Sequence, residues 1–546
     1  MKKKTKQSVT RTSLSRERFD RDPTPLLLSS TLSSEDVARL LTPYGIEHPP
    51  QADSNLQSMA GDPEERRALA VILQELLEAV CETADPDHAL NAWEQYVTSG
   101  IQRRTLFQFL AQAPRMLHLL CTIFGNSPAM AETLIRDPML LYWLAEERVE
   151  LRCPNRKQRD RSLRESLGTF RSYELRCDAL RRFKRKEMLH IGIRDLLHVA
   201  DVLETVSSLS DLAVVLIQAA YEIVDQELRA QHGTPTHKNR HGDMVETGFV
   251  ILGMGKLGGG ELNYSSDVDL VYVYESSEGQ THGRSQDVCV SNEEYFEKLA
   301  RELTHVLNDA TDEGTVFRVD LRLRPEGDVG SLAKSLDDSV RYYRTRGRDW
   351  ERMAFIKSYP IAGHKQVGRK FLRQIRSFIW GKKDAPPELV IETVQSLKAK
   401  IQKNLLQRGE ETRHVKLGIG GIREVEFLVQ AFQLLHVHQF PQVMERNTLK
   451  ALDGLGELNL LSRCSVKQLA TSYQFLRDLE HKLQMVNDLQ THVLPRDLRE
   501  IAKCAVRMGY DKGVSSSETA QVFLDDYGLH TTEVHRIYRQ NISERH

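Results

Sequence analysis

The feature that most constrains the fold of this chain is a glycine-rich segment between two short apolar runs. Residues 249–252 and 268–274 are rich in aliphatic and aromatic side chains and have the length of buried strands. Between them, residues 253–260 read Gly-Met-Gly-Lys-Leu-Gly-Gly-Gly, and glycine permits the backbone conformations that a tight turn requires. The pattern therefore predicts two strands that are joined through a glycine turn.

Two aspartates, Asp267 and Asp269, lie at the start of the second predicted strand. Side chains two residues apart project from the same face of a strand, so both carboxylates point at one spot. Two adjacent anions repel each other unless a cation lies between them, and oxygen-only ligands suit Mg²⁺ or Mn²⁺. The preceding turn can present backbone N–H groups to a phosphate. A metal next to a phosphate is typical of nucleotide chemistry.

A third strand, at residues 315–325, is predicted by the alternation of apolar and charged side chains. Its charged face carries three arginines and one aspartate, namely Arg318, Asp320, Arg322 and Arg324. Arginine binds phosphate oxygens through paired hydrogen bonds, and Asp320 can complete a metal site with the first two aspartates. The alternative is a ladder of salt bridges on an exposed strand face.

Length and composition limit the classes of protein to consider. A chain of 546 residues is too long for one core, so about two to four domains are expected. A net charge of −1 gives no general argument for binding nucleic acid or a membrane surface. The seven cysteines include no C-x-x-C pair, which argues against a zinc ribbon or a disulfide framework. No run reads as a membrane span or a signal peptide, so we expect a cytoplasmic protein.

The patterning along the chain divides it into four parts. We expect a flexible basic arm at 1–30, a helical N-terminal region at 31–245, a catalytic domain at 246–365 and a C-terminal helical bundle at 366–546. Within the second part, Ser127 before Pro128 has the form of a helix N-cap, and residues 232–242 have the composition of a loop. Basic residues gathered at 151–190 are interpreted as one charged helix face over an apolar stripe, rather than as a nucleic-acid patch.

Two further segments carry distinctive motifs. Residues 347–352 read Gly-Arg-Asp-Trp-Glu-Arg, and residues 416–427 read Lys-Leu-Gly-Ile-Gly-Gly-Ile-Arg-Glu-Val-Glu-Phe. Together with the motifs at 253–270 and 318–325, they resemble the bifunctional glutamine synthetase adenylyltransferase/adenylyl-removing enzymes. Weaker similarity extends to 136–138, 181–188 and 490–495. The order of glycine turn, Asp-x-Asp strand and later aspartate strand is similar to that of nucleotidyltransferases related to polymerase β.

The resemblance implies an α+β fold, in which a polymerase-β-like sheet lies between N-terminal helices and a C-terminal helical bundle. Members of the family normally contain two catalytic units. The C-terminal unit attaches AMP to a tyrosine of glutamine synthetase, and the N-terminal unit removes it. This chain resembles the N-terminal, adenylyl-removing half through its motifs at 258–263, 348–352 and 421–424, and it contains no second glycine–Asp-x-Asp unit.

The resemblance also implies roles for individual residues. Asp267, Asp269 and Asp320 are expected to be catalytic and to bind Mg²⁺ or Mn²⁺. Nucleotide or phosphate binding is expected at Lys256, Gly258, Gly259, Ser266, Arg322 and Arg324. A substrate or interdomain role is expected at Glu351, Arg352, Arg423 and Glu424, although acidic groups at 424 and 426 also fit simple capping of a helix N-terminus. For Trp350, a position in the core is the favoured interpretation.

The favoured function is metal-dependent removal of AMP from adenylyl-tyrosine of glutamine synthetase, with phosphate consumed and ADP released. One alternative is ATP-dependent adenylylation of the same tyrosine. Another is a catalytically silent module that binds glutamine synthetase or the PII signal protein. Neither nucleic acid nor a membrane is an expected partner.

Overall fold

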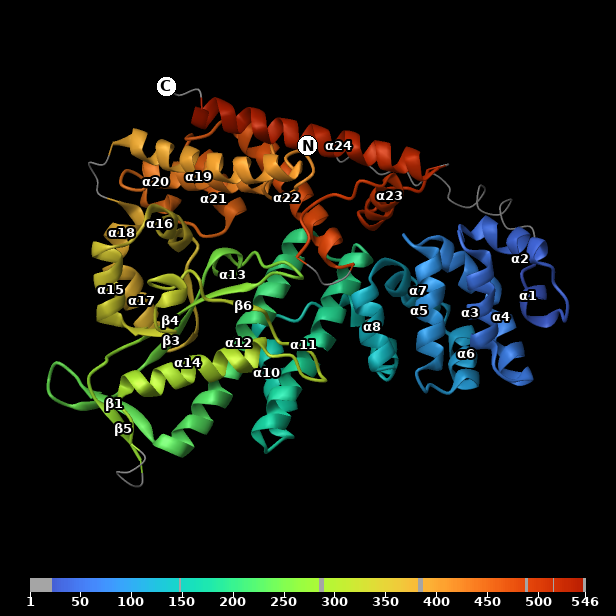
Figure 1. Cartoon of the computed structure of the whole chain (residues 1–546), viewed down its shortest axis with the longest axis horizontal. Coiled ribbons are helices and arrows are strands. Elements are labelled where there is room, and N and C mark those ends of the chain that lie inside the picture. Colours follow the sequence, from blue (N-terminus) through green and yellow to red (C-terminus); the bar gives the residue numbers. More distant parts are fainter. Residues whose placement is uncertain are drawn as a thin grey trace.

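The computed structural model describes residues 22–146, 149–283, 289–381, 386–486, 490–513 and 515–543. It is a mixed α+β structure, 66% helical, with two small sheets. Figure 1 shows the N-terminal helices (blue) at one end, the strands in the body of the molecule, and the C-terminal helices (orange and red) along one edge.

The N-terminal helices form a bundle around a large apolar core. Within it Trp93 packs edge-on against Phe124, with 5.1 Å between ring centroids. The helices are α1 (Pro25–Leu28), α2 (Ser34–Leu41), α3 (Pro49–Ala60), α4 (Pro63–Cys81), α5 (Pro86–Thr98), α6 (Arg103–Gln112), α7 (Pro114–Asn126), α8 (Pro128–Arg136) and α9 (Leu140–Ala145). The predicted N-cap is confirmed, because the Ser127 hydroxyl accepts a hydrogen bond from the N–H of Met130.

The predicted flexible arm falls mostly on residues 1–21, which lie outside the described residues. Helix α1 follows directly and buries Leu26 and Leu27 in the core of the N-terminal bundle. The packed structure therefore begins before residue 30, because these two leucines remove apolar area from water.

Three longer helices connect the bundle to the sheet: α10 (Arg156–Gly168), α11 (Tyr173–Leu196) and α12 (Val202–His232). The apolar stripe expected in α11 is buried at Ala179, Leu180 and Leu189, but Leu175, which was expected in the same stripe, is exposed. By length and composition alone, α12 could cross a membrane, which corrects the expectation that no segment has that character. The apolar stretch of α12 is 67% buried, since the helix packs against α11, α14 and β8. Its composition is that of a helix enclosed by other elements.

The central sheet has the strand order β6-β4-β3-β8, with β7 also paired to β4. Its strands are β3 (Phe249–Gly253), β4 (Val268–Tyr274), β6 (Val319–Asp320), β7 (Ala333–Ser335) and β8 (Tyr359–Gly363). Strands β3 and β4 are antiparallel and joined through the glycine segment, as the sequence predicts. Both faces are buried, because Ile251 and Phe249 pack toward α12 and α14 (Asn292–Asn308), whereas Val250 packs into the C-terminal core.

Two predictions about strands were wrong. Residues 232–242 are not simply a loop, because β1 (Thr234–Lys238) pairs with β2 (Met244–Glu246) and β5 (Gln280–His282) in a second sheet. The predicted strand at 315–325 shortens to β6, which covers Val319–Asp320 alone. After Asp320 the chain leaves the sheet in two tight turns, closed by hydrogen bonds from Arg324 N–H to Leu321 O and from Gly327 N–H to Arg324 O. Arg322 and Arg324 therefore do not continue the strand face of Asp320.

The C-terminal part is helical from residue 336 onward, apart from β8. The helices are α15 (Leu336–Thr345), α16 (Asp349–Ile356), α17 (Lys365–Gln374), α18 (Arg376–Trp380), α19 (Pro387–Arg408), α20 (Ile422–His436), α21 (Thr448–Glu457), α22 (Arg463–Gln484), α23 (Leu498–Arg507) and α24 (Ser516–Tyr538). Helix α22 carries buried charges into the middle of the molecule. Lys482 pairs with Asp195 at 2.6 Å, and Glu480 accepts a hydrogen bond from Asn263 at 2.5 Å. These contacts fix the C-terminal helices against both α11 and the glycine segment.

Candidate active site

A cavity of about 560 Å³ lies where β4 and β6 begin, between the glycine segment and the C-terminal helices. All three predicted aspartates, Asp267, Asp269 and Asp320, line it. Asp269 and Asp320 are directly paired in register because β4 and β6 run parallel at this point. The sheet thus brings together carboxylates that are about 50 residues apart in the chain.

The electrostatics of the cavity reflect this convergence. Burial, followed by the negative charges of Asp320 and Asp267, raises the pKa of Asp269 to about 6. Asp267 accepts a hydrogen bond from Arg318 Nε at 2.9 Å. Although burial opposes it, hydrogen bonds from Arg322 hold the pKa of Asp320 below its ordinary value. Asp269 is therefore the carboxylate whose negative charge is least compensated by a direct partner.

The donor set suits a hard divalent cation, since it consists of three carboxylates that face one cavity. As the side chains stand, the described residues contain no group of three or more His, Cys, Asp or Glu that is arranged to hold a metal ion. Two of the carboxylates are paired with Arg318 and Arg322, whose side chains are 44% and 72% exposed. Both arginines have room to turn toward solvent, so the residues fit a metal after these two ion pairs open.

The glycine segment approaches the aspartates at Gly255, which the sequence had not singled out. Gly255 has φ +53°, and a Cβ atom there would lie 3.0 Å from Oδ2 of Asp269. Gly258 and Gly259 fall inside the short helix α13 (Gly255–Gly259) and do not line the cavity. The N–H of Gly258 donates to Met254 O, and a Cβ at Gly258 would clash with the carbonyl of Lys357. The N–H of Gly258 is thus used within the helix, contrary to the expectation that it faces a phosphate.

The other predicted phosphate-binding residues divide into two groups. Lys256, Ser266 and Arg322 line the cavity. Arg324 does not, because its buried guanidinium donates to the carbonyls of Leu321 and Gly330 and so closes the turn after β6. Strand alternation had placed Arg324 on the same face as Asp320, and the early end of β6 removes that relation.

The motif at 347–352 contributes Trp350 to the cavity, rather than the expected Glu351 and Arg352. Glu351 is buried and accepts hydrogen bonds from the Tyr342 hydroxyl and the Arg348 N–H, while Arg352 Nε donates to Ile379 O. Neither lines the cavity. Trp350 does line it and is 37% exposed, so the expectation of a core position was wrong.

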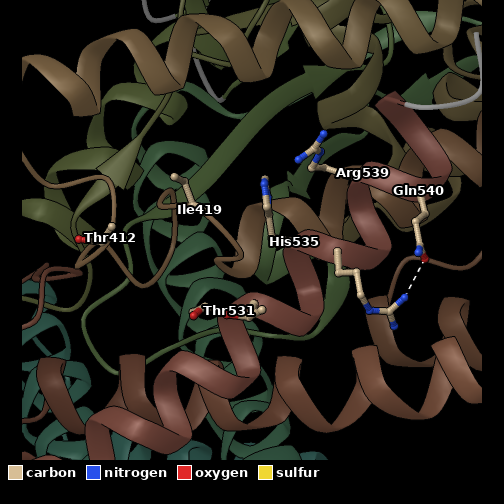
Figure 2. Close-up of a pocket in the computed structure, with 8 residues that line it drawn as sticks. Thr412, Ile419, Thr531, His535, Arg539 and Gln540 are labelled. Atoms are coloured by element: carbon tan, nitrogen blue, oxygen red, sulfur yellow. Dashed lines mark hydrogen bonds between the residues drawn. The ribbon is translucent and has the colours of Figure 1, made fainter.

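Arg423 and Glu424 lie in the first turn of α20 and point to different places. Arg423 lines the cavity. Glu424 is held on the other side of the helix by Lys398 at 2.8 Å and by His535 of α24 at 3.1 Å. Figure 2 shows His535 at a second cavity, of about 460 Å³, together with Thr412, Ile419, Thr531, Arg539 and Gln540.

Sequence reasoning missed several residues that line the aspartate cavity. They are Lys357, Lys400, Lys416, Glu426, Gln430, Gln484, Gln490 and His492. Four of these, Lys416, Glu426, Gln490 and His492, lie within segments that carry the family resemblance, at 416–427 and 490–495, and that was the available signal. Their approach to the aspartates depends on the packing of α20 and α22 against the sheet, which local patterning does not predict.

A small mixed sheet with Asp269 on β4, Asp267 directly before it, Asp320 on the neighbouring strand and a glycine segment beside them is consistent with the fold of the polymerase-β-like nucleotidyltransferases. Comparison with known proteins agrees. Residues 117–374 match the family model described as glutamate-ammonia ligase adenylyltransferase, and residues 395–542 match the model described as GlnD PII-uridylyltransferase.

Individual relatives carry the name bifunctional glutamine synthetase adenylyltransferase/adenylyl-removing enzyme. The protein from Nitrosococcus oceani is 38% identical over 72% of this chain and 40% of its own length. The protein from Thioalkalivibrio sulfidiphilus is 40% identical over 61% of this chain and 33% of its own length. The protein from Bartonella quintana is 34% identical over 75% of this chain and 41% of its own length. Residues 117–374 therefore form a domain of the glutamate-ammonia ligase adenylyltransferase family. The chain resembles the N-terminal half of the named relatives, and its match spans about two-fifths of their length.

Proposed function

We propose that this chain is a metal-dependent enzyme that removes AMP from the adenylyl-tyrosine of glutamine synthetase by phosphorolysis. The observation that carries the proposal is the convergence of Asp267, Asp269 and Asp320 on one cavity beside the glycine segment. The likeness to the adenylyl-removing half of the named relatives supports the choice of substrate. Because its reactants are phosphate and a metabolic enzyme and its product is ADP, we place the reaction in the cytoplasm.

Asp267, Asp269 and Asp320 would hold Mg²⁺ or Mn²⁺, and such an ion supplies charge stabilisation at the attacking and leaving oxygens. Arg322 is mostly exposed and reaches the same cavity, so it can exchange Asp320 for an oxygen of the adenylyl phosphate. Because Gly255 has no side chain, there is space beside the carboxylate of Asp269 that any other residue at this position would occupy. These residues bind and orient the phosphate ester.

In the proposed reaction, an oxygen of hydrogen phosphate attacks the phosphorus of the AMP ester. A new P–O–P bond forms, and the bond from phosphorus to the tyrosine oxygen breaks. The proton that hydrogen phosphate carried ends on the tyrosine oxygen, so the products are ADP and free tyrosine. No oxidant or further reactant is needed.

The reverse type of reaction, ATP-dependent adenylylation of the same tyrosine, is a second candidate. The printed names of the relatives join both activities, and the same three carboxylates serve transfer in either direction. The match of residues 395–542 to a PII-uridylyltransferase model motivates PII as a regulatory partner. A silent regulatory module is a third candidate, which the full set of aspartates in the cavity disfavours.

The test is to mix the purified chain with adenylylated glutamine synthetase and Mn²⁺ and to measure ADP with and without phosphate. We expect ADP only when phosphate is present, and we expect Asp267→Asn and Asp269→Asn to reduce its rate about 100-fold or more, as for other lost charge-stabilising groups. Asp453→Asn is the matched control, since Asp453 is exposed on α21. Near-normal rates in the first two variants contradict the proposal. AMP incorporation from ATP with unmodified synthetase would instead favour adenylylation.

A further inference from the structure

The wall of the cavity that faces away from the sheet carries cations and amides. Lys416 precedes the glycine cluster at 418–421, Arg423 begins α20, and Gln484 ends α22. They come from the C-terminal helices, whereas the aspartates come from the sheet. The cavity therefore has an anionic side and a cationic side, and the cationic side has no role in holding a metal.

The lysines around this cavity differ in how they are paired. Lys256 lies 2.8 Å from Glu480, and Lys357 donates to Glu261 and Glu426 at 2.8 and 3.0 Å. Lys416, in contrast, has no hydrogen-bond or ion-pair partner among the described residues. Lys416 is partly buried, and a partly buried ammonium without a partner is unfavourable unless a ligand supplies one.

Two neighbours of Lys416 also have unused donors. Gln484 is fully buried, and its Nε2 has no hydrogen-bond partner among the described residues. Its Oε1 accepts from the N–H of Ser265 at 3.4 Å, which leaves the amide nitrogen as the free end. Arg423 contacts Glu426 through Nη1 at 3.3 Å, while its Nε is buried and unpartnered. The wall thus offers one ammonium, one guanidinium and one amide donor to the same space.

Lys416, Arg423 and Gln484 line the same cavity as the three aspartates, where the reaction is proposed to occur. Lys416 therefore faces the place where an adenylyl phosphate would lie beside the carboxylates. A second tetrahedral anion between them would be near enough to attack that phosphate.

We propose that Lys416, Arg423 and Gln484 form the binding site for inorganic phosphate, the attacking reactant. This inference rests on the proposed phosphorolytic function. Lysine contributes a point charge, arginine and the amide contribute directed N–H donors, and a tetrahedral oxyanion has oxygens for all three. Glu426 pairs with Lys357 through one oxygen and contacts Arg423 Nη1 through the other, which leaves Arg423 Nε for the phosphate, and Glu480 pairs with Lys256. The attacking oxygen is then held on the cationic side, and the tyrosine oxygen leaves from the side of the sheet.

The first experiment measures ADP formation from adenylylated glutamine synthetase as phosphate is varied. For Lys416→Met we expect the KM for phosphate to rise about tenfold or more, the effect of losing one charge-assisted hydrogen bond, with a kcat at saturating phosphate close to that of the unchanged chain. Lys416→Arg should recover most of the affinity. Lys467→Met is the matched control, since Lys467 is an exposed lysine on α22. A fall in kcat at an unchanged KM for phosphate overturns the assignment.

The second experiment measures binding of inorganic phosphate to the full chain by calorimetry, without turnover. We expect binding to the unchanged chain and to Lys467→Met, and at least about tenfold weaker binding to Lys416→Met. Gln484→Met provides an independent variant with the same expected direction. If no ADP forms but Lys416→Met still weakens phosphate binding, the reaction is wrong and the binding site stands. If the unchanged chain binds no phosphate, or all variants bind it equally, the site is wrong whatever the activity.

Discussion

Replacement of Lys357 by methionine should destabilise the protein strongly, because this lysine ties three separate segments together. Its ammonium donates to Glu261 directly after the glycine segment, to Glu426 on α20 and to Thr448 at the start of α21, at 2.8, 3.0 and 2.8 Å. Lys357, Glu261 and Glu426 are all at most 8% exposed at their side chains. Methionine keeps most of the volume but leaves two buried carboxylates without this cation.

The magnitude follows from the burial of the network. Removing one partner of a buried ion pair costs about 3–5 kcal/mol, and we expect Lys357→Met to lower the free energy of unfolding by that amount. An exposed pair gives the contrast, since Lys298 and Glu294 lie one turn apart on α14 with side chains 38% and 54% exposed. Lys298→Met should cost about 0.5 kcal/mol or less. Urea unfolding followed by circular dichroism compares the two, within the cooperative unit that contains the sheet and α20.

The pH dependence gives a second signature of the same change. Although burial opposes it, the charges of Lys357 and Arg423 hold the pKa of Glu426 well below its ordinary value. Glu426 therefore contributes stability that is present above its unfolded pKa and is lost as the pH falls. Without Lys357, burial should raise that pKa, and stability should then be lost as the pH rises. If Lys357→Met lowers the free energy of unfolding by less than about 1 kcal/mol, or leaves its pH dependence unchanged, Lys357 does not stabilise the two buried carboxylates.

Three other changes test separate parts of the structure. Gly255→Ala should lower both activity and thermal stability, because φ is +53° and the new methyl would contact Asp269. Gly454 lies on α21 with open space around it, so Gly454→Ala should raise the free energy of unfolding by up to about 1 kcal/mol. Burial and His492 lower the pKa of His414 to about 4, so stability should fall as the pH drops from about 6.5 toward 4, and His414→Asn should flatten that dependence in thermal melts. Arg324→Met should lower the melting temperature, while the exposed Arg322→Met should change kinetics with little loss of stability.

Local patterning predicted the parts of the fold that neighbouring residues determine. The two strands around the glycine segment and the N-cap at Ser127 each depend on residues close in the chain. The length of β6 could not be predicted in the same way. Alternation of apolar and charged side chains continues to residue 324, but the chain turns after Asp320, where Arg324 binds carbonyls of the following loop.

The candidate site was predictable to the extent that its residues share one sheet. Strand alternation placed Asp267 with Asp269, and the predicted neighbouring strand brought Asp320 to them. The phosphate-binding glycines were chosen from the composition of the segment alone. Composition does not distinguish Gly255, which lies beside Asp269, from Gly258, which packs closely on the backbone of Lys357. The cationic side of the cavity was not predicted from the sequence, because Lys416 and Gln484 reach the cavity only through the packing of distant helices.

The most direct test of the central claim follows the phosphorus atom of the attacking phosphate. Adenylylated glutamine synthetase is incubated with the chain, Mn²⁺ and ³²P-labelled inorganic phosphate, and the nucleotide product is separated and degraded. We predict ADP that carries the label in its β-phosphate, with the tyrosine released unmodified. Release of unlabelled AMP, or no release of nucleotide at all, would contradict it.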